Sequence, residues 1–140
     1  MTAEELWRQS GLTGEYEAWA FEDAPDQLAD LVRQGIKTAT CSAYDLYRIE
    51  GEPVPKVGGY SVILDSRGDA VCIVKTTKVC VMAFDRVSEA HARKEGEGDR
   101  TLSHWRTVHR DYLTRVLARN NLTFSEKTAV VCEEFELAYV

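Results

Sequence analysis

The stretch from Gly35 to Thr40, GIKTAT, places a lysine and two threonine hydroxyls at the junction of two predicted elements. The apolar spacing over 26–34 predicts a helix, and Gly35 favours its end because glycine adopts left-handed backbone without penalty. The alternation after Lys37 predicts a strand in which Thr38 and Thr40 share one face. A partly buried lysine can act as a base toward a neighbouring hydroxyl. Spacing alone favours the simpler interpretation, a solvated lysine at a helix end.

A second group of candidate residues surrounds His91 and Glu95, which lie four residues apart in a predicted helix and so share a face. The acidic segment from Glu95 to Asp99 is predicted to be a flexible loop that could carry a carboxylate into a cleft. An exposed helix with alternating charges is the simpler interpretation. His104 and His109 are five residues apart, which is not metal-ligand spacing, and we expect both in packing or surface positions.

Composition limits the function. The 140 residues carry a net charge of −6, which argues against a wide nucleic-acid footprint but leaves room for a small basic cleft. No run of about eighteen apolar residues occurs, so no membrane-spanning helix is expected. The N-terminal segment lacks the basic-then-apolar pattern of a secretion signal, and we expect a cytoplasmic protein.

The four cysteines lie far apart in the sequence, without Cys-x-x-Cys pairs or histidines at zinc-ligand spacing. We therefore predict no metal and no cofactor. Cys72, Cys80 and Cys132 fall in apolar, strand-like runs, so we expect them to be buried and unpaired in a reducing compartment. Cys41 follows Thr40 directly, but no histidine lies close to it in sequence.

The order of the predicted elements favours an α+β fold, with a curved or closed sheet flanked by helices. The expected helices are 3–9, 26–34 with Asp23 as N-cap, 42–49, 88–95 and 101–120, and the expected strands are 60–65, 70–83 and 128–140. The turn at 66–69 joins the first two of these strands as a hairpin, whereas 15–21 fits either a strand or a helix. We expect one domain over 1–140, with a helical N-terminal extension over about 1–14.

Several segments together resemble an ASCH domain, from about Trp19 to Tyr139. They are GIKTAT, PKVGGY before a strand, the strand 76–81 running into Phe84-Asp85, and HARKEGEGD followed by Leu102 and Trp105. The likeness is to the longer bacterial ASCH proteins. The resemblance implies a PUA-like small β-barrel flanked by helices, and an association with RNA.

A small bacterial branch of that family hydrolyses N4-acetylcytidine with a lysine, a threonine and a glutamate, which correspond here to Lys37, Thr40 and Glu95. The resemblance thus implies that Thr40 attacks the acyl carbonyl, Lys37 takes its proton and Glu95 assists the leaving amine or holds the base. The extra residues between Thr40 and Gly58 could reshape or cover the cleft. Further substrate contacts are expected from the following residues: Thr38, Tyr44, Arg48, Lys56, Lys75 and Trp105.

Two alternatives stay open. In an RNA-binding module, Lys37 and Lys56 would contact phosphate and Tyr44 or Trp105 would stack on a base. A ribonuclease is the third hypothesis, although its acid–base pair is not identifiable in the sequence. The expected partner is a modified nucleoside or RNA, not a membrane, and the small acidic chain favours a nucleoside over long RNA. A homodimer is compatible with the sequence, which does not specify the oligomeric state.

Overall fold

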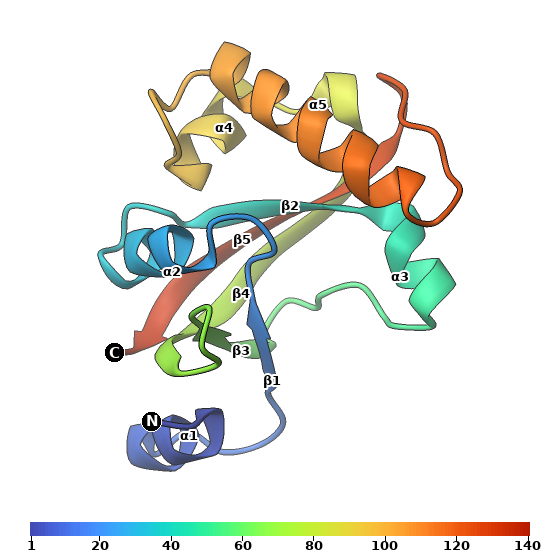
Figure 1. Ribbon diagram of the computed structural model, residues 1–140. Coiled ribbons are helices and arrows are strands. Elements are labelled where there is room, and N and C mark those ends of the chain that lie inside the picture. Colours follow the sequence, from blue (N-terminus) through green and yellow to red (C-terminus); the bar gives the residue numbers. More distant parts are fainter.

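The computed structural model describes residues 1–140 as one five-stranded sheet surrounded by helices (Figure 1). The strands are β1 (Glu17–Ala20), β2 (Ala39–Ala43), β3 (Tyr60–Leu64), β4 (Ala70–Ala83) and β5 (Ala129–Tyr139). Their order in the sheet is β1-β3-β4-β5-β2, with β1 parallel to β3 and the other neighbours antiparallel. The sheet curls into a half-barrel.

Five helices cover the sheet. They are α1 (Ala3–Ser10), α2 (Pro25–Arg33), α3 (Tyr44–Glu50), α4 (Glu89–Glu95) and α5 (Leu102–Ala118), and a short 3₁₀ turn occupies Phe84–Arg86. Figure 1 shows α4 and α5 together above the sheet, α1 at the opposite end of the molecule, and α2 and α3 on either side. None of these helices has both the length and the apolar composition needed to cross a membrane.

Three apolar clusters attach these helices to the sheet. The largest lies beneath α4 and α5, where Phe84, Trp105 and Leu113 pack on residues of β2 and β5. A second cluster joins α2 to the middle of the sheet, and a third buries Leu6 and Trp7 of α1 against β3 and β4. Burial of an aliphatic or aromatic side chain contributes about 1.5–3 kcal/mol, so these contacts fix where each helix sits.

The expected α+β fold with a PUA-like curved sheet is confirmed, and each expected helix and strand is present with ends shifted by a few residues. The ambiguous segment 15–21 contains β1, which extends the sheet beside β3. The hairpin is also confirmed, since β3 and β4 pair antiparallel. Ser88 caps α4 by accepting a hydrogen bond from the His91 amide at 3.0 Å.

Two expectations about individual residues are wrong. Ala24, with φ of 46°, precedes α2 without any side-chain cap, and Asp23 instead binds Arg115. Cys80 is exposed because the second half of β4 pairs only with β5 and is an edge there, while the other three cysteines are buried and all four are free. On α5, His109 is buried whereas its neighbour Val108 is exposed.

The turn after α4 contacts the segment before β2, which brings the two candidate groups together. The Thr38 amide donates to the Lys94 carbonyl at 2.7 Å. Gly96 ends α4 with φ of 71°, and a Cβ on it would lie 2.7 Å from the Ile36 carbonyl oxygen. This glycine is therefore required both by its backbone conformation and by close packing.

We predict that Gly96→Ala lowers the free energy of unfolding more than Gly51→Ala does. Gly51 ends α3 with φ of 68° but has open space around it, so both variants incur a left-handed penalty of about 1–2 kcal/mol. Only Gly96→Ala adds a backbone clash, which costs about 1–3 kcal/mol more. Urea denaturation measures the difference, and equal losses in the two variants would contradict the packing described here.

Candidate active site

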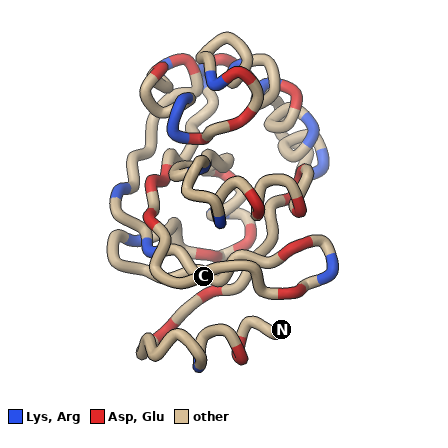
Figure 2. Tube along the Cα trace, turned by 90° about the vertical axis from the view of Figure 1, so that its left-hand side faces the viewer, with Lys and Arg blue, Asp and Glu red and all other residues tan.

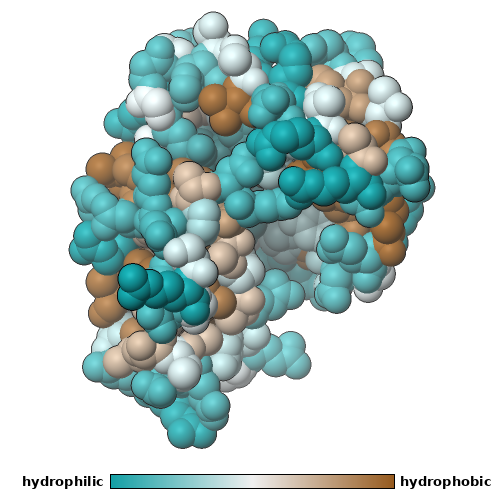
Figure 3. All heavy atoms as spheres, viewed as in Figure 1, coloured by the Kyte–Doolittle hydropathy of each residue, from teal (hydrophilic) through white to brown (hydrophobic).

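A cavity of about 670 Å³ opens between the sheet and the helices above it. It is lined by β1 and the residues after it, by β2, by α3 with the loop that follows, and by one face of α5. The space-filling view shows the surface hollowed in this region (Figure 3). Its volume falls within the range of about 300–1,000 Å³ that is typical of small-molecule sites.

Lys37 is the cation of this cavity, and it is almost completely buried, with 1% of its surface exposed. Its backbone follows α2, where Ile36 and Lys37 amides both donate to the Leu31 carbonyl. Its Nζ donates to Glu97 Oε2 at 2.8 Å, to Glu95 Oε1 at 3.2 Å and to the Glu95 carbonyl at 3.4 Å. An ammonium has three donor positions, so these acceptors account for all of them.

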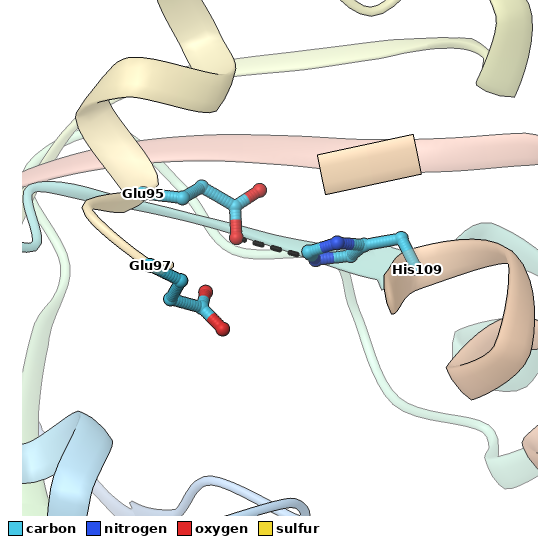
Figure 4. Close-up of side chains that lie close together, drawn as sticks. All are labelled: Glu95, Glu97 and His109. Atoms are coloured by element: carbon cyan, nitrogen blue, oxygen red, sulfur yellow. Dashed lines mark ion pairs between the residues drawn. The ribbon is translucent and has the colours of Figure 1, made fainter. Parts of the chain in front are cut away.

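Glu95 is the carboxylate on which this network converges. Oε2 accepts from Trp105 Nε1 at 2.6 Å and lies 2.8 Å from His91 Nε2, while Oε1 is 3.3 Å from His109 Nε2 and 3.2 Å from Lys37. Figure 4 shows Glu95 and His109 pointing toward each other from α4 and α5, with Glu97 beside them. Both oxygens of a buried carboxylate are thus satisfied, as burial of a charge requires.

The partners of Glu95 determine its ionisation. Burial would raise the pKa of Glu95, but Lys37, His109 and His91 outweigh it and hold the pKa well below its ordinary value. Burial would likewise lower the pKa of His91, but the neighbouring Cys132 and Glu95 side chains raise it to about 9. The pKa of Cys132 is lowered to about 6, mainly by its hydrogen bond with Cys41 and also by His91. Glu95 is therefore an anion near neutral pH, surrounded by cationic or donating groups.

Glu95, Glu97 and His109 also present ligand atoms within 4.8 Å of one another, which is a spacing compatible with a metal ion. Lys37 Nζ, however, already hydrogen-bonds both carboxylates. A metal ion there would have to displace a buried ammonium and compete with its charge. The residues therefore fit a lysine-centred ion pair better than a metal centre.

Thr40 and Glu133 form a second polar group on the sheet itself. They are register partners on β2 and β5, and both line the cavity. The Thr40 hydroxyl makes no hydrogen bond within the protein, whereas Glu133 Oε2 accepts from the Thr76 hydroxyl at 2.6 Å. The pKa of Glu133 is raised, mainly by burial and to a smaller extent by the charge of Glu17. The hydrogen bond from Thr76 lowers this pKa but does not cancel the effect of burial.

The structure brings Lys37, Thr40 and Glu95 to the same cavity, as expected, although Thr40 and Glu95 are far apart in the sequence. Their catalytic role stays a prediction. The inserted segment after Thr40 also reaches the cavity, because Glu52, Pro53 and Pro55 form part of its wall.

The six residues expected as substrate contacts lie outside the lining of this cavity. Trp105 is 3% exposed, stacked between Phe84 and His109, and offers no free face to a base. Arg48 pairs with Asp45 on the surface. The Thr38 hydroxyl donates to the Lys94 carbonyl, and Lys75 lies over the Tyr60 ring. Tyr44 and Lys56 are exposed.

Sequence patterns did not single out the acidic character of the cavity. One lysine and no arginine lie among its lining residues, against eight carboxylates: Glu17, Glu22, Asp23, Glu50, Glu52, Glu95, Glu97 and Glu133. In Figure 2, acidic and basic segments are interspersed along the trace. Phosphate groups need clustered cations, so this cavity favours a neutral or cationic ligand.

Four cavity residues were missed at the sequence level: Tyr47, Glu97, His109 and Glu133. The five-residue spacing of His104 and His109 gave no indication of a site. Of these two histidines, His109 contacts Glu95. Glu133 stands next to Cys132 in an apolar strand run. A charged residue in such a run was the signal that could have identified it, because a buried carboxylate without a cation is costly.

Comparisons with known proteins agree with this geometry. The family model for the ASCH domain matches residues 17–139. A crystal structure of an ASCH domain from Lactobacillus crispatus JV V101 is 30% identical, with a TM-score of 0.91 over 98% of this chain and 94% of that chain. Protein EF3133 from Enterococcus faecalis V583 is 35% identical, with a TM-score of 0.87 over 97% of this chain and 85% of that chain.

A more distant solved structure, the hypothetical protein PH0355, shares the fold with a TM-score of 0.60 at 18% identity, over 88% of this chain and 99% of that chain. No significant match is found among curated proteins.

We predict that stability falls as pH rises above about 6.5 through His109. Burial would lower the pKa of His109, but the Glu95 carboxylate raises it, which means that the protonated form is stabilised by folding. That contribution is complete below the unfolded pKa of about 6.5 and is lost as pH rises through the folded pKa. Urea denaturation at pH values above about 6.5 should show a shallower decline for His109→Gln.

The control for this prediction is His104→Gln, since the His104 ring makes no hydrogen bond within the protein. It should follow the parent protein at every pH. A His109→Gln profile parallel to that of the parent would contradict the assigned ionisation.

Proposed function

The chain belongs to the ASCH domain family, and we propose that it hydrolyses the amide bond of an acylated nucleoside, with N4-acylated cytidine as the substrate. ASCH domains are PUA-like and associated with RNA. In this proposal residues 1–140 act as one ASCH domain, with α1 as an N-terminal extension. The observation that carries the proposal is the acidic, nucleoside-sized cavity that contains Lys37, Thr40 and Glu95 together.

The charge of the cavity supports a nucleoside over an RNA strand. A phosphate entering it would meet carboxylates on several sides, and the Lys37 ammonium is already neutralised by Glu95 and Glu97. Cytidine and its acylated forms carry no charge on the base near pH 7. Aromatic side chains on the wall, Trp19, Tyr47 and Tyr112, offer surfaces on which a base can stack.

Thr40 is the proposed nucleophile because its hydroxyl is free of protein partners and faces the cavity. Its Oγ forms a bond to the acyl carbon, the bond from that carbon to the exocyclic nitrogen breaks, and the leaving amine receives a proton. Water then hydrolyses the acyl-threonine ester to release the carboxylic acid and restore the hydroxyl. No other chemical group is consumed.

Lys37 and Glu95 support this chemistry as a buried ion pair. The sequence-based interpretation assigned the base role to Lys37, but the three acceptors around Nζ favour its ammonium form, which has no lone pair to accept a proton. As an ammonium it binds Glu95 and Glu97 and keeps the two carboxylates in place on one side of the cavity. Glu95 in turn holds the ammonium in place.

The first functional prediction concerns the substrate. N4-acetylcytidine should be deacetylated with a kcat/KM at least about tenfold higher than that for its 5′-monophosphate, because each added phosphate charge opposes the carboxylates. Chromatographic separation of cytidine from the acetylated form measures both rates. Similar rates for the two substrates, or a preference for acetylated RNA, would contradict the cavity assignment.

The second functional prediction concerns the nucleophile. Thr40→Val replaces the hydroxyl by a methyl group of similar volume and should reduce kcat at least about 100-fold. The matched control is Thr38→Val, because Thr38 lies two residues earlier and outside this cavity. Thr38→Val should retain turnover, and a Thr40→Val protein with undiminished kcat would exclude the covalent mechanism.

A further inference from the structure

We propose that Glu133 is the general base that accepts the Thr40 hydroxyl proton, an assignment that rests on the proposed hydrolase function. No resemblance or sequence pattern assigns a role to this residue. The reasons are its position opposite Thr40, the free carboxylate oxygen that it presents, and the absence of a cation bound to it.

The register of the sheet places the two side chains side by side. Thr40 on β2 and Glu133 on β5 are direct antiparallel partners. Directly opposed side chains on one face have Cβ atoms about 4.5–5.5 Å apart, so a glutamate can reach a neighbouring hydroxyl. Both residues line the cavity, which puts the pair where a substrate carbonyl would lie.

Hydrogen bonds orient Glu133 and leave one of its oxygens available. Oε2 accepts from the Thr76 hydroxyl on β4 at 2.6 Å, while Oε1 accepts no hydrogen bond from the protein. Glu133 is 5% exposed, so the carboxyl group is held between two strands. An oriented carboxylate with one free oxygen is the arrangement that general base catalysis requires.

Glu95 and Lys37, the other two charged residues of the proposed site, are less suited to this step. Glu95 has donors on both oxygens, and Lys37 has acceptors at all its donor positions. Glu133 has no lysine or arginine partner. The one charged group that acts on it is Glu17 of β1, which raises its pKa, and Glu133 in turn raises the pKa of Tyr47 of α3.

Proton transfer through Glu133 balances the reaction. As Thr40 Oγ bonds to the acyl carbon, its proton passes to Glu133 Oε1, and the protonated carboxyl then donates to the leaving nitrogen. In the second half, Glu133 accepts a proton from the attacking water and returns it to Thr40 Oγ as the ester breaks. The raised pKa suits a group that must both accept and donate a proton.

The experiment uses p-nitrophenyl acetate as an acylating probe, which tests the activation of Thr40 without depending on the natural substrate. The parent protein should release nitrophenolate in a burst and gain the mass of one acetyl group at Thr40. The acylation rate should rise with pH through a single ionisation assigned to Glu133. Deacetylation of N4-acetylcytidine is measured in parallel with the same protein samples.

Glu133→Gln keeps the size of the side chain and an acceptor for Thr76 but removes the base. We expect acylation at Thr40 to fall at least about 100-fold, with loss of the pH dependence and little change in KM for N4-acetylcytidine. The control is Glu136→Gln, an exposed residue of β5 outside the cavity, which should match the parent. Thermal unfolding of each variant checks that the fold is retained.

The outcomes separate this inference from the proposed function. Glu133-dependent acylation of Thr40 without deacetylation of any acylated nucleoside would support Glu133 as the base for Thr40. The same result would reject an acylated nucleoside as the substrate. Acylation that is unchanged in folded Glu133→Gln would overturn the inference, even if the nucleoside is hydrolysed. The absence of any acylation at Thr40 in the parent protein would overturn it as well.

If Glu133→Gln does not fold, the pH dependence of Thr40 acylation in the parent protein tests the role of Glu133. A profile that is flat, or that follows the ionisation of a lysine rather than a carboxyl group, would overturn the assignment.

Discussion

The buried charge of Glu95 is the constraint on which this arrangement depends. Its two oxygens contact side chains from three separate parts of the chain, since Lys37 precedes β2, His91 lies on α4, and Trp105 and His109 lie on α5. Breaking such a network by removing one partner costs about 3–5 kcal/mol, because the remaining charge stays buried without compensation. The carboxylate therefore fixes the helical layer against the sheet as well as the electrostatics of the cavity.

This network divides the carboxylates of the cavity into different roles. Glu95 is saturated with donors, is held ionised and has no free lone pair facing the substrate. Glu133 accepts one hydrogen bond from a neutral hydroxyl and has its pKa raised mainly by burial. The pKa values of two glutamates in one cavity are thus shifted in opposite directions by their surroundings.

The wall of the cavity is rich in carboxylates. Glu22 and Asp23 of the wall are paired with Arg119 and Arg115 of α5, whereas Glu50 and Glu52 come from α3 and the loop after it. That segment forms one side of the cavity and adds negative charge to its wall. In the proposed function, this negative charge favours a single uncharged nucleoside over an RNA strand.

The sequence by itself determined the helices and strands, and it determined the local positions of Lys37 and Glu95. Period-3.6 and period-2 patterns identified the helices and strands, because apolar spacing reports which face is buried. It also placed Lys37 at a helix–strand junction and His91 one turn from Glu95. It misjudged Cys80 because a strand's composition does not reveal which half of it lies at a sheet edge.

Only the tertiary structure decided which side chains meet. Register between β2 and β5 sets Glu133 opposite Thr40, and the docking of α5 brings His109 rather than His104 to Glu95. These contacts join residues distant in the chain, so no local spacing encodes them. Protonation followed from the same contacts, because the charge state of a buried group depends on the partners that folding supplies.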